Sequence, residues 1–197
     1  MRLTVSHLSK SFGGVPVLRD VSFTAGPEPV CVMGPSGEGK TTLVRILLGL
    51  ERADSGFVSG LENARASAVF QEDRLLPGRT ALENLRFVLG KAYDEPAARR
   101  LLEELGLANA ADRPVREFSG GMRRRTALAR ALIVPFDFLA LDEPFTGLDK
   151  DSRRQCLNAV QARTAGKTVL LVSHDESDAG VLGARIVRLS KGTADTH

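Results

Sequence analysis

The segment GPSGEGKT, residues 34–41, constrains the fold of this chain more than any other feature. It matches the pattern GxxxxGK[ST] completely, follows a short apolar strand and opens a helix, which are the contexts that make such a match credible. Its three glycines let backbone N–H groups close around phosphate groups without side-chain clash. Lys40 would then reach the β- and γ-phosphates of a nucleotide, and the Thr41 hydroxyl would bind Mg²⁺. The residues expected to contact the nucleotide here are Gly34, Pro35, Ser36, Gly37, Glu38, Gly39, Lys40, Thr41 and Thr42.

Strand-like and helix-like segments alternate along the rest of the chain, which predicts a largely parallel sheet with crossover helices. Helical spacing of Leu, Ala and Val between the strands at 65–70 and 138–141 predicts a helical insertion of about 60 residues. The segment at 184–189 is expected to be the last strand. The other expected strands are 2–8, 17–24, 28–33, 56–60 and 168–173, and the expected helices are 40–50, 80–90, 96–106, 119–134 and 152–163.

Length and charge narrow the possible functions. A chain of 197 residues fits one domain. The net charge of +3 suits an anionic ligand but is too small to indicate nucleic acid binding, so no nucleic acid partner is expected. No run of about 18 apolar residues is present, so no transmembrane helix is expected and any membrane role must come through a partner.

A second glycine-rich turn, Ser119-Gly120-Gly121, stands at the expected start of a helix. Bare backbone N–H groups at a helix N-terminus form an anion-binding surface. One compact chain is unlikely to need two such surfaces for one nucleotide. Two copies facing head to tail could instead place ATP between the phosphate loop of one copy and this turn of the other.

Two carboxylates, Asp142 and Glu143, end the apolar strand at 138–141. They could be solvated acids at a strand terminus. Beside a phosphate loop, however, Asp142 is expected to bind Mg²⁺ directly or through water, and Glu143 to polarise the attacking water.

With these motifs in this order, the chain resembles the ATP-binding subunit of ABC transporters from Phe12 to His174. In that family Ser119-Gly120-Gly121 corresponds to the signature motif, and Asp142 and Glu143 to the Walker B aspartate and the catalytic glutamate. The resemblance implies an α/β fold with a P-loop NTPase core, a mostly parallel sheet and a small antiparallel β part near the N-terminus. It implies one ATPase domain over residues 1–197, with a helical subdomain at approximately 72–135, inserted between the phosphate loop and Walker B.

The resemblance also assigns roles to residues that carry no signal alone. Gln71 would contact Mg²⁺ and the attacking water, and His174 would contact the γ-phosphate. Asp149, in the Gly147-Leu148-Asp149 stretch, matches a loop that crosses the dimer interface. Phe12 could stack on adenine, or it could be an ordinary core phenylalanine; the family more often has tyrosine there.

The signature departs from the common pattern, because Phe118 replaces Leu and Met122 replaces Gln. Met122 cannot hydrogen-bond as an amide does, but the phosphate-facing groups are intact, so activity should survive. Glu38 stands where the family often has a small residue, and its side chain is expected to point away from the phosphates. The triplet Arg123-Arg124-Arg125 is interpreted as a solvated basic face with one residue paired to acids.

The resemblance implies a Mg²⁺-dependent ATPase with ATP as ligand. It would dimerise with a second copy of itself or with a paired homologue, and drive a separate transmembrane permease from the cytoplasmic face of the membrane. A substrate-binding protein could act through the permease. The stretch at 69–85 looks most like importers of nitrate, sulfonates and related small anions, including taurine. Leu75-Leu76-Pro77 is unusually apolar for a loop, and it could be a partner surface or pack on the domain's own helices.

Two other classes compete with this interpretation. A non-transport ABC protein of repair, translation or cluster assembly is one, although the chain lacks the heptads of the repair members and has one nucleotide domain where translation members usually have two. A P-loop kinase or GTPase is the other, and the SGG turn and the missing NKxD motif argue against it.

Overall fold

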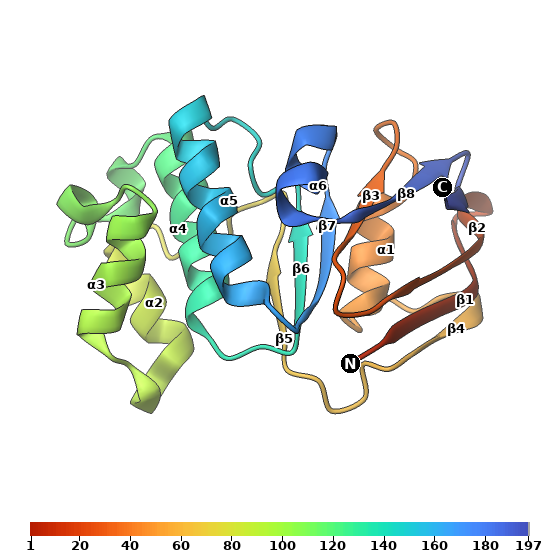
Figure 1. The fold of residues 1–197 in the computed structure, drawn as a ribbon, viewed down its shortest axis with the longest axis horizontal. Coiled ribbons are helices and arrows are strands. Elements are labelled where there is room, and N and C mark those ends of the chain that lie inside the picture. Colours follow the sequence, from red (N-terminus) through yellow and green to blue (C-terminus); the bar gives the residue numbers. More distant parts are fainter. Residues whose placement is uncertain (197) are drawn as a thin grey trace. The chain divides into compact units, whose positions relative to one another are not determined.

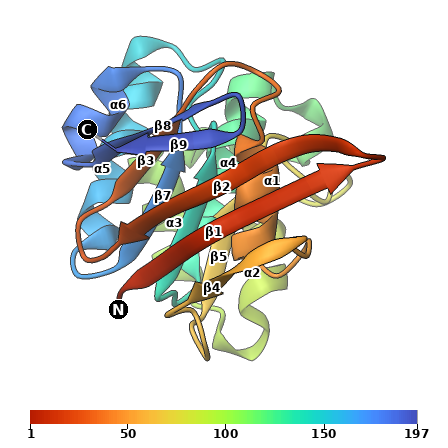
Figure 2. The same cartoon turned by 90° about the vertical axis from the view of Figure 1, so that its right-hand side faces the viewer.

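The protein is described by a computed structural model that covers residues 1–196 (Figures 1 and 2). Near the N-terminus lies a three-stranded antiparallel sheet of order β2-β1-β4. Its strands are β1 (Leu3–Phe12), β2 (Val15–Ala25) and β4 (Ser55–Ser59). This is the small antiparallel part that the family resemblance implied.

A six-stranded sheet has the order β5-β6-β7-β3-β8-β9, and β6, β7, β3 and β8 pair in parallel. Every residue of β3, β6 and β7 is buried, which explains why these strands are apolar runs rather than alternating patterns. The predicted mostly parallel sheet is confirmed. Its strands are β3 (Val30–Met33), β5 (Ala66–Val69), β6 (Phe138–Asp142), β7 (Thr168–Val172), β8 (Arg185–Ser190) and β9 (Thr193–Thr196).

The prediction that 184–189 would be the last strand is wrong, because β9 follows β8 as an antiparallel hairpin. The turn between them places Lys191 at φ 50° and Gly192 at φ 79°. Two successive positive φ values suit a two-residue hairpin turn, but lysine at the first position is not the Asn or Asp that signals one. A short helix, α6 (Glu176–Leu182), also escaped prediction.

By contact the chain divides into two compact units, and each is described by itself. The first contains residues 1–66, 136–142 and 164 onward, and includes helices α1 (Lys40–Leu47) and α6. Helix α1 lies between the antiparallel sheet and the parallel sheet in both views, and it contacts β2 and β6 (Figures 1 and 2). The helix that follows the phosphate loop therefore packs against a strand on each of two sides.

The second unit contains residues 67–135 and 143–163. Helices α2 (Ala81–Leu89), α3 (Glu95–Glu104) and α4 (Gly120–Ile133) pack on one another, and α5 (Lys150–Thr164) joins α3 through an ion pair of Arg163 with Glu104 at 2.8 Å (Figure 1). Short 3₁₀ turns occupy Gly90–Ala92, Ala108–Ala110 and Val115–Glu117. A helical subdomain at approximately 72–135 stays a prediction.

Candidate functional site

The phosphate loop connects β3 to α1, as its sequence pattern predicted. Lys40 is the first residue of α1 and is only 6% exposed. Its ammonium group donates hydrogen bonds of 2.7 Å to the carbonyl oxygens of Gly34 and Pro35, the first two loop residues. The cation therefore lies inside the loop, where β- and γ-phosphates would be bound.

Two glycines of this loop have no room for a side chain. A Cβ on Gly39, at φ +84°, would stand 2.7 Å from the Leu18 side chain and from the Val17 carbonyl oxygen. A Cβ on Gly34 would stand 2.3 Å from the Leu189 carbonyl oxygen. The loop is thus shaped by close backbone approach to β2 and β8, which only glycine permits.

The Glu38 side chain has a partner within the protein. Its carboxylate accepts a hydrogen bond of 2.9 Å from the Gly192 backbone N–H, in the turn between β8 and β9. The side chain is thereby held on a backbone group of the protein itself, which ties the loop to the hairpin that the sequence did not reveal.

The register of the parallel strands brings the phosphate loop, Asp142 and His174 to the same end of the sheet. Val172 of β7 pairs with Val32 on one side and with Asp142 on the other. The carboxyl ends of these strands therefore coincide, and the phosphate loop, Asp142 and His174 all follow there. Asp142 is 2% exposed, and its Oδ2 accepts a hydrogen bond of 2.8 Å from the Thr41 hydroxyl.

Thr41 and Asp142 fit a Mg²⁺ ion. The ion prefers oxygen ligands and is usually held by one or two carboxylates together with substrate phosphates. Here one hydroxyl and one carboxylate lie within hydrogen-bond distance of each other beside the phosphate loop.

Phe12 ends β1, where it pairs with Val15 at the tip of the β1–β2 hairpin. The ring is 47% exposed, so the core interpretation is wrong. The Lys10 ammonium lies 4.9 Å from the ring centroid, and it also pairs with Glu51 at 3.0 Å. An exposed ring held at a hairpin tip offers a flat surface to a nucleotide base.

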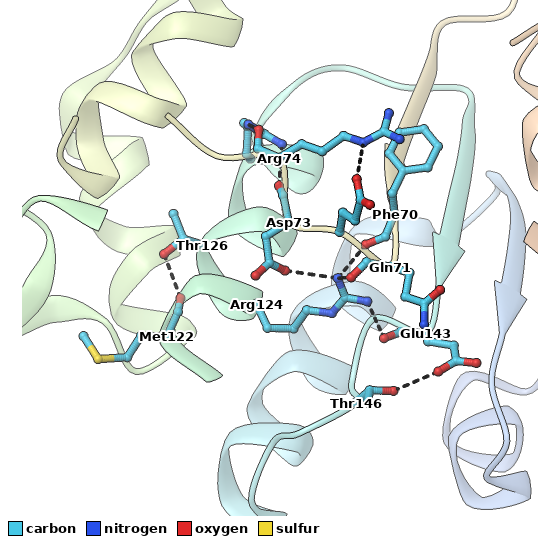
Figure 3. A network of polar contacts seen from close by, with 11 residues as sticks. Phe70, Gln71, Asp73, Arg74, Met122, Arg124, Thr126, Glu143 and Thr146 are labelled. Carbon is cyan, nitrogen blue, oxygen red and sulfur yellow. Dashed lines mark hydrogen bonds and ion pairs between the residues drawn. The ribbon is translucent and has the colours of Figure 1, made fainter. Parts of the chain in front are cut away.

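In the second unit, the backbone carbonyls of Gln71 and Glu143 both accept hydrogen bonds from the Arg124 side chain. Gln71 follows β5, and its backbone carbonyl accepts a hydrogen bond from Arg124 at 3.2 Å. The Glu143 carbonyl accepts one from the same guanidinium at 2.5 Å (Figure 3). Glu143 has φ 50°, an uncommon value for a residue other than glycine, and its carboxylate accepts a hydrogen bond from the Thr146 hydroxyl at 3.3 Å.

The signature turn forms the N-terminus of α4. Ser119 is the N-cap residue, and its hydroxyl accepts a hydrogen bond of 3.2 Å from the Met122 backbone N–H. Ser119 and Gly120 are exposed, and they leave the first helical N–H groups accessible. The geometry suits an anion at the helix start.

Asp149 directly precedes α5, and its carboxylate accepts hydrogen bonds from the first turn of that helix. Its carboxylate accepts hydrogen bonds from the Ser152 backbone N–H at 2.9 Å and from the Ser152 hydroxyl at 2.8 Å. These bonds, the backbone one first, hold the pKa of Asp149 below its ordinary value. Within one chain, this residue acts as a helix cap.

The arginine triplet differs from its sequence interpretation. Only Arg123 is exposed, whereas Arg124 is buried and 5% exposed. Arg125 donates to the Leu105 carbonyl at 2.9 Å. One pairing with an acid was expected, and Arg124 makes it, with Asp73 at 3.1 Å. The burial of Arg124 could have been predicted from the sequence, because Leu128 and Ala131 follow it at i+4 and i+7 on the buried face of α4.

Comparisons with known proteins agree with this geometry. A family model described as "ABC transporter" matches residues 18–146. The aliphatic sulfonates import ATP-binding protein SsuB 1 of Rhodococcus jostii is 43% identical in an alignment of length 182 that covers 88% of this chain and 73% of that protein. The taurine import ATP-binding protein TauB of Yersinia pestis is 37% identical in an alignment of length 205 that covers 96% of this chain and 80% of that protein.

Among solved structures, the dimer of MJ0796, a bacterial ABC transporter cassette, superposes with a TM-score of 0.88. It is 27% identical, and the match covers 98% of this chain and 96% of that one. The same cassette in a post-hydrolysis state, bound to ADP and Pi, matches equally well. The likeness to sulfonate and taurine importers that the sequence suggested is confirmed, and the chain belongs to the ABC transporter family of ATP-binding proteins.

Proposed function

We propose that this chain is the ATP-hydrolysing subunit of an ABC transporter, which dimerises on ATP and drives a separate permease that imports a small solute. The hydrogen bond between Thr41 and Asp142 carries the proposal. It joins the end of the phosphate loop to the end of β6, two elements 101 residues apart in sequence, at the place where a Mg-nucleotide would be held.

Each site residue has a proposed role. Lys40 neutralises the β- and γ-phosphates, and the backbone of residues 34–42 wraps around them. Phe12 stacks on adenine. Thr41, Asp142 and Gln71 hold Mg²⁺, which when bound neutralises charge on the phosphates.

Glu143 orients and polarises the attacking water, and His174 donates a hydrogen bond to the γ-phosphate. Catalysis then depends on positioning and on charge stabilisation, because phosphoryl transfer needs little covalent chemistry from the protein.

The second copy completes the site. Its Ser119-Gly120-Gly121 turn contacts the γ-phosphate from the opposite side, and its Asp149 lies at the dimer interface. ATP is thus shared between two chains, and hydrolysis releases them. The exposed, capped start of α4 supports this role, since its N–H groups are accessible.

No helix within residues 1–196 is long and apolar enough to cross a membrane. We place the chain on the cytoplasmic face of the membrane through its permease. The contact is at Leu75-Leu76-Pro77, where both leucines are half-buried and proline is exposed. The side chain of the buried Asn84 fixes this loop, by accepting from the Leu76 N–H at 2.8 Å and donating to the Leu76 carbonyl at 3.2 Å.

The names of the relatives support a proposal about the solute class. Proteins named for the import of aliphatic sulfonates and of taurine are 43% and 37% identical to this chain. We propose a small organic sulfonate as cargo, with the permease and a substrate-binding protein selecting it.

The proposal is tested with Lys40→Ala. The variant should lose most of its ATP affinity, because the phosphates lose their principal cation, and should hydrolyse no ATP in the presence of Mg²⁺. Isothermal titration and a phosphate-release assay measure the two effects. Lys91→Ala removes an exposed lysine of the second unit and should match wild type. A Lys40→Ala variant with wild-type affinity would place the phosphates elsewhere.

A further inference from the structure

Arg124 is a buried arginine whose guanidinium joins two catalytic segments. It lies on α4, one turn after the signature motif, and is 5% exposed. Arginine offers five N–H donors in a rigid planar fork, so it can bind several acceptors in a fixed geometry. The acceptors that it reaches are therefore fixed relative to one another.

The two arms of the fork reach different segments. Nη1 donates to the Phe70 carbonyl at 2.5 Å, to the Gln71 carbonyl at 3.2 Å and to the Asp73 carboxylate at 3.1 Å. Nη2 donates to the Glu143 carbonyl at 2.5 Å. Figure 3 shows the guanidinium between the segment at 70–73 and Glu143.

The Glu143 backbone is the part that most needs such support. A φ of 50° places glutamate in the left-handed region, which residues with a Cβ rarely adopt. Its carbonyl oxygen accepts from Arg124 and also from the Thr146 N–H at 3.3 Å. Such conformations persist only where the surroundings over-determine them, and they cluster at active sites.

We propose that Arg124 is a positioning residue for ATP hydrolysis: it fixes the backbones of Gln71 and Glu143 and links both to the signature helix. The inference rests on the proposed function, since it assumes that Gln71 and Glu143 act on the attacking water. In this proposal Arg124 acts through Gln71 and Glu143, whose backbone carbonyls accept its hydrogen bonds at 3.2 and 2.5 Å.

A second arginine of the same helix provides a matched control. Arg130 donates to the Arg74 carbonyl at 2.7 Å and to the Asp73 carbonyl at 3.0 Å. It therefore holds the same loop from the same helix, and in the part of the chain that the structure describes its hydrogen bonds go to neither Gln71 nor Glu143. Comparing the two arginines separates support of the loop from positioning of the catalytic glutamate.

The test measures turnover and ATP affinity of Arg124→Ala, Arg124→Lys and Arg130→Ala. Displacing a catalytic group by about 1 Å can cost about a hundredfold in rate. We expect turnover to fall by about ten- to a hundredfold in both Arg124 variants, with an unchanged dissociation constant for ATP. Lysine keeps the charge and the pairing with Asp73, but one ammonium group cannot replace a two-armed fork. Arg130→Ala should lose less than about threefold, well below the loss expected for displacement of a catalytic group.

A double-mutant cycle tests the route of the effect. If Arg124 acts through Glu143, the loss caused by Arg124→Lys should shrink to within about twofold in a Glu143→Gln background, because coupled residues are not additive. An equal fold-loss in both backgrounds would overturn the proposal, and so would full turnover of Arg124→Lys. Should Arg124→Ala fail to fold, Arg124→Lys decides. A wild-type protein without Mg-ATP hydrolysis would instead contradict the proposed function, so the two failures are distinguishable.

Discussion

In the proposed mechanism the Glu143 carboxylate orients and polarises the attacking water. Glu143 follows the buried Asp142 directly in sequence, is half-buried, and has a left-handed backbone conformation. Its carboxylate has the Thr146 hydroxyl as a partner at 3.3 Å. A carboxylate held in this way can accept a proton from water or orient it, whereas an amide of the same size cannot accept the proton.

Glu143→Gln should therefore bind Mg-ATP normally and hydrolyse it about a hundredfold more slowly or worse, the scale of a lost general base. Phosphate release under saturating ATP measures the rate, and isothermal titration measures binding. Glu103→Gln makes the same chemical change at an exposed position of α3 and should leave the rate unaltered. A rate within a fewfold of wild type would assign the base to another residue.

At this scale the sequence is most informative where a motif has a fixed spacing. Motifs of fixed spacing single out Lys40, Thr41 and Asp142, and the structure joins Thr41 to Asp142 by a hydrogen bond of 2.8 Å. Arg124 could not be assigned from the motif, because three of its acceptors are carbonyl oxygens, at residues 70, 71 and 143. A carbonyl is present at every residue, so the sequence carries no mark of which one an arginine binds.

At the scale of elements, α2 has the clearest start in the chain. Thr80 accepts a hydrogen bond from the Glu83 N–H at 3.1 Å, and the Glu83 carboxylate accepts one from the Thr80 N–H at 2.8 Å. This reciprocal arrangement is a capping box, and its backbone hydrogen bond holds the pKa of Glu83 below the ordinary value.

Thr80→Ala should destabilise the protein by about 1 kcal/mol, the typical cost of losing an N-cap side chain. In a chain of this length, such a loss lowers the melting temperature by about 2–4 °C. Thr80→Ser keeps the accepting hydroxyl and serves as the control, with a much smaller shift. Equal melting temperatures for the alanine and serine variants would mean that water replaces the cap at no cost.

Most elements were predictable because their periodicity is strong, and the failures have local causes. Helix α6 has only 7 residues, too few to establish a 3.6-residue period. Strand β1 continues to Phe12, beyond the expected end at Leu8, through register irregularities in its pairing with β2. Such irregularities interrupt the alternation by which a strand is recognised.

At the scale of the whole molecule, the proposed site in one copy is half of what catalysis needs. In this proposal the phosphate loop of one copy and the signature turn of another share the nucleotide, and the MJ0796 cassette, to which this chain is similar, is dimeric. The dimer should therefore be transient in the wild type, because hydrolysis removes the γ-phosphate that both copies contact.

Glu143→Gln should make this dimer persistent. We expect the variant to sediment as a dimer with Mg-ATP and as a monomer without it. Adding Ser119→Arg should return it to a monomer, because the long cationic side chain occupies the exposed start of α4, where the partner's nucleotide would lie. ATP affinity of the double variant should stay at the monomer's value, since Ser119 acts on the nucleotide of the other copy.

Asn109→Arg adds the same charge at an exposed site of the 3₁₀ turn and should leave the dimer intact. A double variant that still dimerises with ATP would refute the head-to-tail arrangement, and one that loses ATP affinity would place Ser119 in its own chain's site.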